Sequence, residues 1–498
     1  MLASRMADHV RPYLYYDVAV SICSTCYRKV EGKILFQDDR VYMSKRCPTH
    51  GWEKVLLSDD VAYYRKCREV FLKTPEQPHR YQTATRYGCP YDCGLCPDHE
   101  QHTCLALIEL GDVCNLECPI CYASSGPSRT RWRSLDEIER MLDALVRSER
   151  EPDVLQLSGG EPTLHPDFFA VVEAAKARPI RHLMINTNGI RLAKDPEFAQ
   201  RLASYRPGIE VYLQFDSFER QALELLRGAD LRAIHEKAVV HCNDAKLSVT
   251  LVSTVGRGIN DGELGQTIEW ALEQPCVRGV TFQPIQAAGR LEGYDPARDR
   301  LTLSEVRRKI LEQTKVFASD DILPVPCHPD AIAMAYALKV GKKVQPLTSL
   351  VPLDVLLTGT KNTIAFSREP ELKGHLAQLF STGHSLTSRA DTLRDLLCCL
   401  PRVESVENWT YENLFRVIIL EFMDAFNFDV RSVKKSCVHI VQSDGRIVPF
   451  DTFNLFYRDG LEAERLMPLR AAIDPGQASA LPPDGKRPIG SRRLEVIS

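Results

Sequence analysis

Three cysteines lie close together in the segment GDVCNLECPICYAS, residues 111 to 124. Cys114, Cys118 and Cys121 follow the spacing C-x3-C-x2-C, which offers three thiolates to a metal centre and omits a fourth. Closed zinc sites and closed iron–sulfur clusters take four protein ligands, so a metal centre on this segment would be one ligand short. The apolar run CLALIEL precedes it and indicates a buried strand, whose carboxyl end is where α/β proteins bind ligands.

Strand and helix patterns alternate after the three cysteines. The expected strands are DVLQL, RHLMINT, IEVYLQFD, LSVTLVST and VRGVTFQPI, with helical segments between them. A further helix before DVLQL begins at SLDE, where Ser134 and Glu137 predict a capping box. The pattern predicts an α/β protein whose parallel strands form a partial (β/α)6 barrel.

The sequence SGGEP, residues 158 to 162, follows the second expected strand. Its adjacent glycines allow a close backbone approach, and Glu161 can accept a hydrogen bond from an ammonium group. A three-cysteine loop followed by a GGE motif resembles the radical S-adenosylmethionine (SAM) superfamily, over about residues 104 to 290. The resemblance implies a catalytic 4Fe-4S cluster on the three cysteines, whose open iron chelates SAM to supply a 5'-deoxyadenosyl radical for hydrogen abstraction from unactivated carbon.

The same resemblance implies which residues contact SAM. The superfamily surrounds the cofactor with an aromatic residue after the last cysteine, the GGE motif and polar residues at the ends of later strands. In this sequence these positions are Tyr122, Gly159, Gly160, Glu161, Asn186, Gln214, Asp216 and Ser253. For the strand-end residues, ordinary turn chemistry explains the residue types equally well.

Eleven of the seventeen cysteines lie between residues 23 and 121. The N-terminal segment has no apolar secretory core, so we expect a cytosolic chain, in which clustered cysteines indicate metal centres rather than disulfides. The isolated Cys242 and Cys276 are expected to be buried apolar residues.

The first cysteine group consists of CSTC and, after a hairpin pattern with a turn at QDD, CPTH. Cys23, Cys26, Cys47 and His50 predict a zinc-ribbon or rubredoxin-like domain that binds one zinc or iron ion. Cys67 is an alternative to His50 as the fourth ligand.

The second group lies in YGCPYDCGLCPDHEQHTC. Cys89, Cys93 and Cys96 repeat the spacing of the opening segment, and Cys104 follows them. Four cysteines predict a closed auxiliary 4Fe-4S cluster.

A narrower resemblance covers nearly the whole chain. The order CxxC, CPxHG, the two three-cysteine segments, SGGEPTLHPD, PVPCHPD and CVHIVQSDGRIVPFDTFNLFYR resembles an archaeal and bacterial group of tetraether synthases and 7,8-dihydro-6-hydroxymethylpterin dimethyltransferases. The resemblance implies several metal centres, with candidates for a further cluster at Cys327, Cys398, Cys399 and Cys437. Buried thiols are the alternative at each of these positions. Asp451 departs from the group, because cysteine is expected there in many relatives.

These patterns divide the chain into five expected regions. They are the metal-binding ribbon at 1–70, an auxiliary-cluster segment at 71–104, the radical SAM core at 105–300, a mixed α+β region with a further cluster at 301–473, and a disordered tail at 474–498.

Three functions are compatible with these patterns. The first is radical coupling or modification of lipid alkyl chains, as in tetraether synthases. For this function, FRVIILEFMDAFNF and MAYALKV are expected to present apolar helical faces, either to an alkyl channel or to the core. The second is radical methylation of a dihydropterin or similar heterocycle, which needs polar recognition groups and a one-carbon donor. The third is a non-catalytic iron–sulfur electron carrier.

Charge and composition limit the partners. The net charge of -3 and the pI of about 6.5 give no overall basic field, so we expect no nucleic-acid partner. We expect a small-molecule or lipid substrate and an electron donor such as ferredoxin or flavodoxin. The chain is expected in the cytoplasm, with peripheral membrane contact allowed for a lipid substrate.

Overall fold

The computed structural model describes residues 11–72, 74, 76–340, 343–349 and 413–473. Cys398, Cys399 and the tail expected at 474–498 lie outside these residues.

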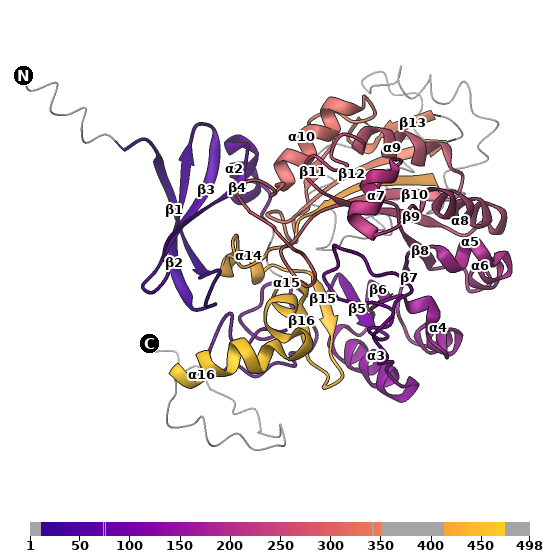
Figure 1. Ribbon diagram of the computed structural model, residues 1–498, viewed down its shortest axis with the longest axis horizontal. Helices are drawn as coiled ribbons and strands as arrows, with labels where there is room; N and C mark the ends of the chain where they lie inside the picture. Colours follow the sequence, from indigo (N-terminus) through magenta and orange to yellow (C-terminus); the bar gives the residue numbers. More distant parts are fainter. Residues whose placement is uncertain (1–10, 73, 75, 341–342, 350–412, 474–498) are drawn as a thin grey trace, which may run out of the picture.

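The N-terminal region is an antiparallel four-stranded ribbon, on the left in Figure 1. Its strands are β1 (Leu14–Ile22), β2 (Lys29–Gln37), β3 (Arg40–Cys47) and β4 (Gly51–Ser58), followed by helix α2 (Val61–Glu69). Asp38 and Asp39 link β2 to β3 with positive φ angles of 52° and 57°, which match the twist of a tight hairpin. The expected hairpin and its turn at QDD are therefore confirmed. Ile34, Val41 and Met43 are fully buried inside the ribbon.

Six parallel strands form the centre of a larger sheet, in sequence order. They are β5 (Leu105–Glu109), β6 (Val154–Ser158), β7 (His182–Thr187), β8 (Ile209–Gln214), β9 (Val249–Val255) and β10 (Val277–Pro284). The helices between them are α3 (Leu135–Glu149), α4 (Phe168–Lys176), α5 (Ile190–Lys194), α6 (Pro196–Ala203), α7 (Arg220–Arg227), α8 (Arg232–Ala245) and α9 (Leu264–Glu273). These helices lie along the outer side of the sheet in Figure 1. The α/β core and its attached metal-binding ribbon are confirmed.

The start of α3 forms half of the expected capping box. The Oγ atom of Ser134 accepts a hydrogen bond of 3.2 Å from the backbone N–H of Glu137. The Glu137 carboxylate instead pairs with Arg133, which precedes the helix.

Strands from the C-terminal region extend this sheet at both edges. Strand β14 (Leu414–Leu420) runs parallel to β10, and β15 (Val438–Val441) runs parallel to β5. Beyond them lie the antiparallel strands β12 (Ile332–Val340), β11 (Leu323–Pro324), β13 (Lys343–Pro346) and β16 (Ile447–Pro449). The other α-helices in the described part of the chain are α10 (Leu303–Gln313), α14 (Val430–Val433), α15 (Phe450–Thr452) and α16 (Met467–Ile473).

The expectation of apolar helices at MAYALKV and FRVIILEF is wrong. These segments form β12 and β14, which pair with each other in antiparallel register. Valine and isoleucine favour a pleated sheet, and burial alternates along most of β14 as a strand requires.

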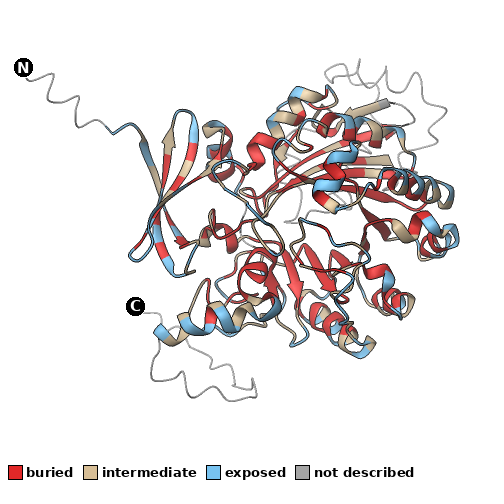
Figure 2. Ribbon diagram, viewed as in Figure 1, coloured by how far each residue is buried: buried red, intermediate tan, exposed pale blue. Residues whose placement is uncertain are grey.

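Apolar side chains cover both faces of the central strands. On β5, Ala106 and Ile108 belong to the core shared with the outer helices, whereas Leu105 and Leu107 face a second core shared with Phe450. Figure 2 shows this burial along the strands. Cys242 and Cys276 are buried in the helix-facing core, as expected. Because both faces are covered, the strands read as continuous apolar runs.

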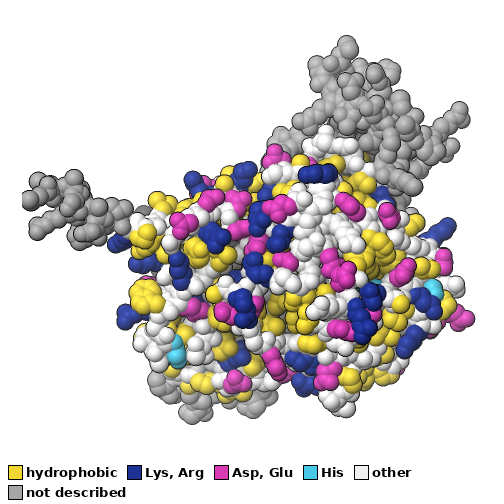
Figure 3. Space-filling view, turned by 45° about the horizontal axis from the view of Figure 1, so that its top comes forward, with side chains coloured by type: hydrophobic (Ala, Val, Ile, Leu, Met, Phe, Trp, Pro, Cys, Tyr) yellow, Lys and Arg dark blue, Asp and Glu magenta, His cyan; other side chains and the backbone are white. Residues whose placement is uncertain are grey.

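The surface is mixed in charge. On the face shown in Figure 3, basic and acidic side chains are interspersed. Among the described residues, no helix combines the length and the apolar character needed to cross a bilayer.

Candidate active site and metal centres

A cavity of about 140 Å³ opens at the carboxyl ends of the central strands. It brings together nine of the residues that the sequence selected, which are Cys114, Cys118, Cys121, Tyr122, Gly159, Gly160, Glu161, Asn186 and Gln214. Asp216 and Ser253 are not among its lining residues. Segments far apart in the chain therefore meet at one site, because parallel strands end at the same edge.

The GGE segment lies directly against the residues that lead into the cysteine loop. The N–H of Gly160 donates to the carbonyl of Gly111 at 3.0 Å, and the N–H of Glu161 donates to the carbonyl of Val113 at 2.9 Å. A Cβ atom on Gly159 would lie 2.4 Å from the Gly111 oxygen, and one on Gly160 would lie 2.1 Å from the Val113 oxygen. Glycine is required because any side chain would separate the two loops.

Glu161 ties the ends of two strands together. Its Oε1 atom accepts hydrogen bonds from the hydroxyls of Thr163 and Thr187 at 2.6 Å and 2.8 Å, and its Oε2 atom accepts one from the N–H of Asn188 at 2.8 Å. Burial raises the pKa of Glu161, and these hydrogen bonds oppose the rise. Most of the acceptor capacity of Glu161 is used within the chain, so in this structure it positions loops.

Arg227 is a site residue that the sequence analysis missed. Its guanidinium donates to both oxygens of buried Asp216, at 2.6 Å and 2.7 Å, and to Gln214 and Thr254. The Ser253 hydroxyl donates to the backbone oxygen of Asp216 at 3.2 Å. Asp216 and Ser253 therefore support Arg227 rather than line the cavity. Arg227 ends helix α7, outside any recognisable motif, so no sequence signal marked it.

The three cysteines fit an iron–sulfur cluster. Burial raises the pKa of Cys114 to about 12 and also raises that of Cys118, while the nearby Arg227 opposes the rise at Cys118. Thiols in this setting need a cation to become thiolate ligands, and cluster iron supplies that charge. Arg290 fixes their loop, because its Nε atom donates to the Cys118 carbonyl at 2.5 Å and its backbone pairs with Cys121.

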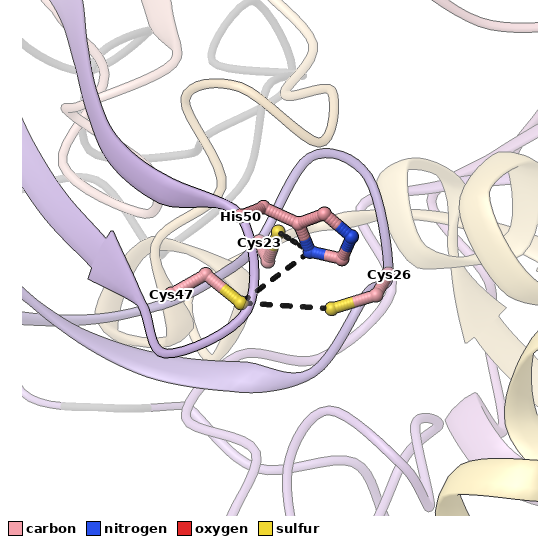
Figure 4. Close-up of side chains that lie close together, drawn as sticks. All are labelled: Cys23, Cys26, Cys47 and His50. Carbon is pink, nitrogen blue, oxygen red and sulfur yellow. Dashed lines mark hydrogen bonds between the residues drawn. The ribbon is translucent and has the colours of Figure 1, made fainter.

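The ribbon holds a four-ligand metal site. The ligand atoms of Cys23, Cys26, Cys47 and His50 all lie within 4.8 Å of one another, as Figure 4 shows for the side chains. His50 Nδ1 is 3.5 Å from the sulfurs of both Cys23 and Cys47. Although burial acts in the opposite direction, hydrogen bonds from the His50 and Thr49 backbone and from the His50 ring lower the pKa of Cys47 to about 6. Cys67 packs in the main core beside Tyr63, so His50 completes the set.

A second buried group consists of Cys104, Cys327 and Cys437, whose sulfurs lie within 4.8 Å of one another. This corrects the predicted grouping of Cys104 with Cys89, Cys93 and Cys96. Cys104 immediately precedes β5, and its N–H donates to the Cys437 carbonyl at 3.0 Å because β5 pairs with β15. Strand pairing between distant segments, which the sequence analysis did not anticipate, decides the neighbours of Cys104.

The remaining cysteines of the auxiliary segment lie near the C-terminal helices. Cys93 is buried, and its sulfur accepts a hydrogen bond of 3.0 Å from the hydroxyl of Thr452. Asp451, where the family resemblance leads us to expect cysteine, is buried and accepts a hydrogen bond from the Met423 N–H. A complete ligand set for Cys89, Cys93 and Cys96 stays a prediction.

Two family models match the chain. The model of the radical SAM superfamily matches residues 108–271, and the model of the HMPTM N-terminal zinc ribbon domain matches residues 15–59. The first match contains the cavity's cysteine loop and GGE segment, and the second contains the four-ligand group of the ribbon.

Three known proteins are similar to all or part of this chain. The 7,8-dihydro-6-hydroxymethylpterin dimethyltransferase of Methanocaldococcus jannaschii is 29% identical over 490 residues, covering 90% of this chain and 96% of that enzyme. The GTP 3',8-cyclase of Pectobacterium atrosepticum is 31% identical over 238 residues, covering 45% of this chain and 68% of that enzyme. The crystal structure of Streptococcus suis SuiB bound to S-adenosylmethionine aligns at 17% identity and a TM-score of 0.34, covering 42% of this chain and 46% of that chain.

The cysteine loop, the GGE segment and the family models together identify a SAM-dependent 4Fe-4S enzyme with a zinc ribbon. The chain belongs to the radical SAM superfamily.

Proposed function

We propose that this radical SAM enzyme methylates carbon atoms of a 7,8-dihydropterin or a similar small heterocycle. The observation that carries the proposal is the match to the pterin dimethyltransferase of M. jannaschii, which spans 90% of this chain. The match to the GTP 3',8-cyclase covers only 45% of this chain. The resemblance to the methyltransferase therefore extends well beyond the shared core.

The chemistry of the cavity supports a planar polar substrate. Amide side chains line it at Asn186, Gln214, Gln283 and Gln286. Aromatic side chains line it as well, with the ring of Phe450 lying 5.0 Å from that of Tyr122 and 4.1 Å from that of Phe422. A flat heterocycle can stack on these rings and hydrogen-bond to the amides.

Lipid coupling is the weaker proposal. It relied on apolar helical faces at MAYALKV and FRVIILEF, and these segments are strands of the sheet. The hypothesis of a lipid substrate therefore loses the apolar helices that were expected to line an alkyl channel.

The chain's own residues position and isolate the reactants. When bound, the cluster and SAM supply a carbon-centred radical that removes hydrogen from the substrate. The three cysteines hold the cluster, Arg227 places a positive charge beside them, and the paired loops at Gly160 and Gly111 fix the geometry. The rings of Phe422 and Phe450 keep water from one wall of the cavity.

Paired incubations test the proposal. Reconstituted and reduced enzyme receives either 7,8-dihydro-6-hydroxymethylpterin with a one-carbon donor or a lipid with saturated chains, and mass spectrometry follows both. We expect the pterin to gain one CH2 unit per step while the lipid keeps its mass. A lipid that loses hydrogen while the pterin stays unchanged would overturn the proposal in favour of alkyl coupling. The enzyme with Cys114, Cys118 and Cys121 all changed to alanine serves as the blank.

A further inference from the structure

A second, larger cavity of about 590 Å³ lies beside the active-site cavity. Three distant parts of the chain form its walls. The ribbon contributes Ser24 and Tyr27 from its metal-binding knuckle, and the C-terminal region contributes residues between Ala425 and Arg465. The core contributes Ser124, Arg129 and several residues between Ala287 and Tyr294. The metal-binding ribbon therefore faces a cavity that adjoins the radical site.

A buried lysine fixes the ribbon in this position. Lys45 Nζ donates to the backbone oxygens of Ile22, Ala425 and Phe426 at 2.7 Å, 2.8 Å and 2.7 Å. Ile22 immediately precedes the first metal ligand, and Ala425 and Phe426 line the cavity. Because three carbonyls surround one buried ammonium group, the ribbon is a fixed wall rather than a loosely attached domain.

Side chains form part of the partition between the two cavities. Ala288 lines both of them. Gln286 lines the inner cavity and accepts a hydrogen bond from Asn454, which lines the outer one, at the long distance of 3.4 Å. Arg458 of the outer cavity lies 5.3 Å from the ring centre of Tyr122, which lines the inner one. The long hydrogen bond between Asn454 and Gln286 can yield by side-chain rotation, whereas Arg458 is held by buried hydrogen bonds of 2.7 Å and 3.1 Å to Glu109. The partition can therefore open beside Gln286 without unfolding the sheet, while Arg458 stays in place.

The outer cavity carries groups suited to a flat, hydrogen-bonding molecule. The guanidinium of Arg465 lies 4.1 Å from the ring centre of Tyr27. Its Nε atom is buried without a hydrogen-bond partner among the described residues and lies 3.8 Å from the Glu464 carboxylate. Asp459 is the one acidic residue in the lining and lies 3.9 Å from Arg131. Its backbone is left-handed, with a φ of 47°. Paired N–H groups on a heterocycle match a carboxylate, and an aromatic face can receive the ring.

We propose that this cavity, which we call the ribbon vestibule, binds the heterocyclic substrate on its way to the inner cavity, and that the metal-binding ribbon is its outer wall. The identity of the substrate rests on the proposed function. The ribbon thereby selects substrate, in addition to any part it has in stability.

A matched pair of substitutions within one knuckle tests the vestibule. Ser24 lines it, whereas its neighbour Thr25 is exposed and lies outside the lining, and both stand between Cys23 and Cys26. We expect Ser24→Trp to weaken binding of 7,8-dihydro-6-hydroxymethylpterin to the unreduced, SAM-loaded holoenzyme by about tenfold, because the indole fills the cavity. Thr25→Trp should bind like the wild type. Thr25→Trp should also form 5'-deoxyadenosine at the wild-type rate without substrate, and metal analysis checks that both variants keep the ribbon metal.

The outcomes separate the vestibule from the proposed function. Wild-type binding by Ser24→Trp, with its metal retained, would overturn the vestibule even if methylation is observed. Binding that is sensitive to Ser24→Trp, without any methyl transfer, would overturn the methyltransferase proposal and keep the vestibule. Absence of pterin binding by the wild type would overturn both.

A second pair covers the case in which Ser24→Trp loses its metal. Asp459→Asn removes the lining carboxylate, and Asp444→Asn changes an exposed aspartate outside the vestibule. We expect the first variant to raise KM for the pterin and the second to leave it unchanged. Equal KM values for the two variants would contradict the vestibule.

Discussion

At the scale of single residues, Arg227 connects several groups of the radical site. It joins the buried carboxylate of Asp216 to Gln214 and stands beside the thiols of Cys118 and Cys121. Although burial acts against it, the charge of Asp216 holds the pKa of Arg227 above its usual range, so Arg227 stays charged. Removing it would leave a carboxylate buried without its partner, next to thiolates of the same sign.

Arg227→Met should therefore weaken both the fold and the chemistry. We expect a loss of about 3–5 kcal/mol in the free energy of unfolding, measured by denaturant titration, and a lower rate of 5'-deoxyadenosine formation. Arg220→Met is the matched control in the same helix, because Arg220 and its partner Glu224 are exposed. The control should behave like the wild type. Equal stability of the two variants would mean that the pair with Asp216 contributes little.

The sequence was most informative where a motif fixes chemistry over a few residues. The cysteine loop, GGE, Asn186 and Gln214 were all expected near the cofactor, and they line one cavity. Arg227 escaped notice because an arginine within a helix carries no local signature. Cys104 was assigned to the wrong group because the spacing of cysteines in the sequence does not show that β15 pairs with β5. This pairing brings Cys437 beside Cys104.

At the scale of elements, the ribbon shows how two short knuckles build a metal site. Pairing of β1 with β2 closes the first knuckle, pairing of β3 with β4 closes the second, and pairing of β2 with β3 places the two knuckles side by side. The hairpin between them could be predicted from its alternation and turn. That His50 rather than Cys67 is the fourth ligand could not be predicted, because this depends on where α2 packs.

Substitution of each rival ligand tests this choice. We expect His50→Ala to lose the ribbon metal, and Cys67→Ala to retain it, when metal content is measured by mass spectrometry after purification. Cys67 is buried in the main core, so Cys67→Ala is expected to lower stability without changing metal content. Metal loss in Cys67→Ala with retention in His50→Ala would reverse the assignment.

The strand β14 is held to the central sheet by a buried ion pair. Glu210 on β8 accepts hydrogen bonds from Arg416 on β14 at 3.0 Å and from His182 on β7 at 2.9 Å. Burial by itself would raise the pKa of Glu210, but Arg416, His182 and Thr250 hold it well below its usual range. A carboxyl group with a depressed native pKa stabilises the fold above its unfolded pKa of about 4.3, and this stability is lost as pH falls.

Arg416→Met should remove this pH-dependent contribution. We expect the variant to be less stable than the wild type by about 3–5 kcal/mol at pH 7, because Glu210 stays buried without Arg416. The difference in the free energy of unfolding between the two proteins should narrow between about pH 5 and pH 3, because the wild type loses the stability that ionised Glu210 provides. Urea titrations at several pH values measure it. A gap that stays constant with pH would show that Glu210 is not the group responsible, and the Glu210→Gln background should reduce the effect of Arg416→Met.

At the scale of the whole molecule, the C-terminal region completes a sheet that begins near residue 105. Its strands cover both edges of the parallel core, and its helices close the cavity beside Phe450 and the ribbon. The parallel core could be predicted, because each of its strands is a local apolar run between helices. The edge strands could not, because β14 and β15 pair with core strands more than a hundred residues away in sequence and apolar helices give similar patterns.

The formation of 5'-deoxyadenosine by two triple variants tests the central claim most directly. One variant changes Cys114, Cys118 and Cys121 to alanine, and the other changes the buried group of Cys104, Cys327 and Cys437. After anaerobic reconstitution and reduction with SAM alone, we predict that the first variant forms no 5'-deoxyadenosine and that the second still forms it, with less bound iron. Formation by the first variant and none by the folded second variant would contradict the assignment of the radical site to the loop after β5.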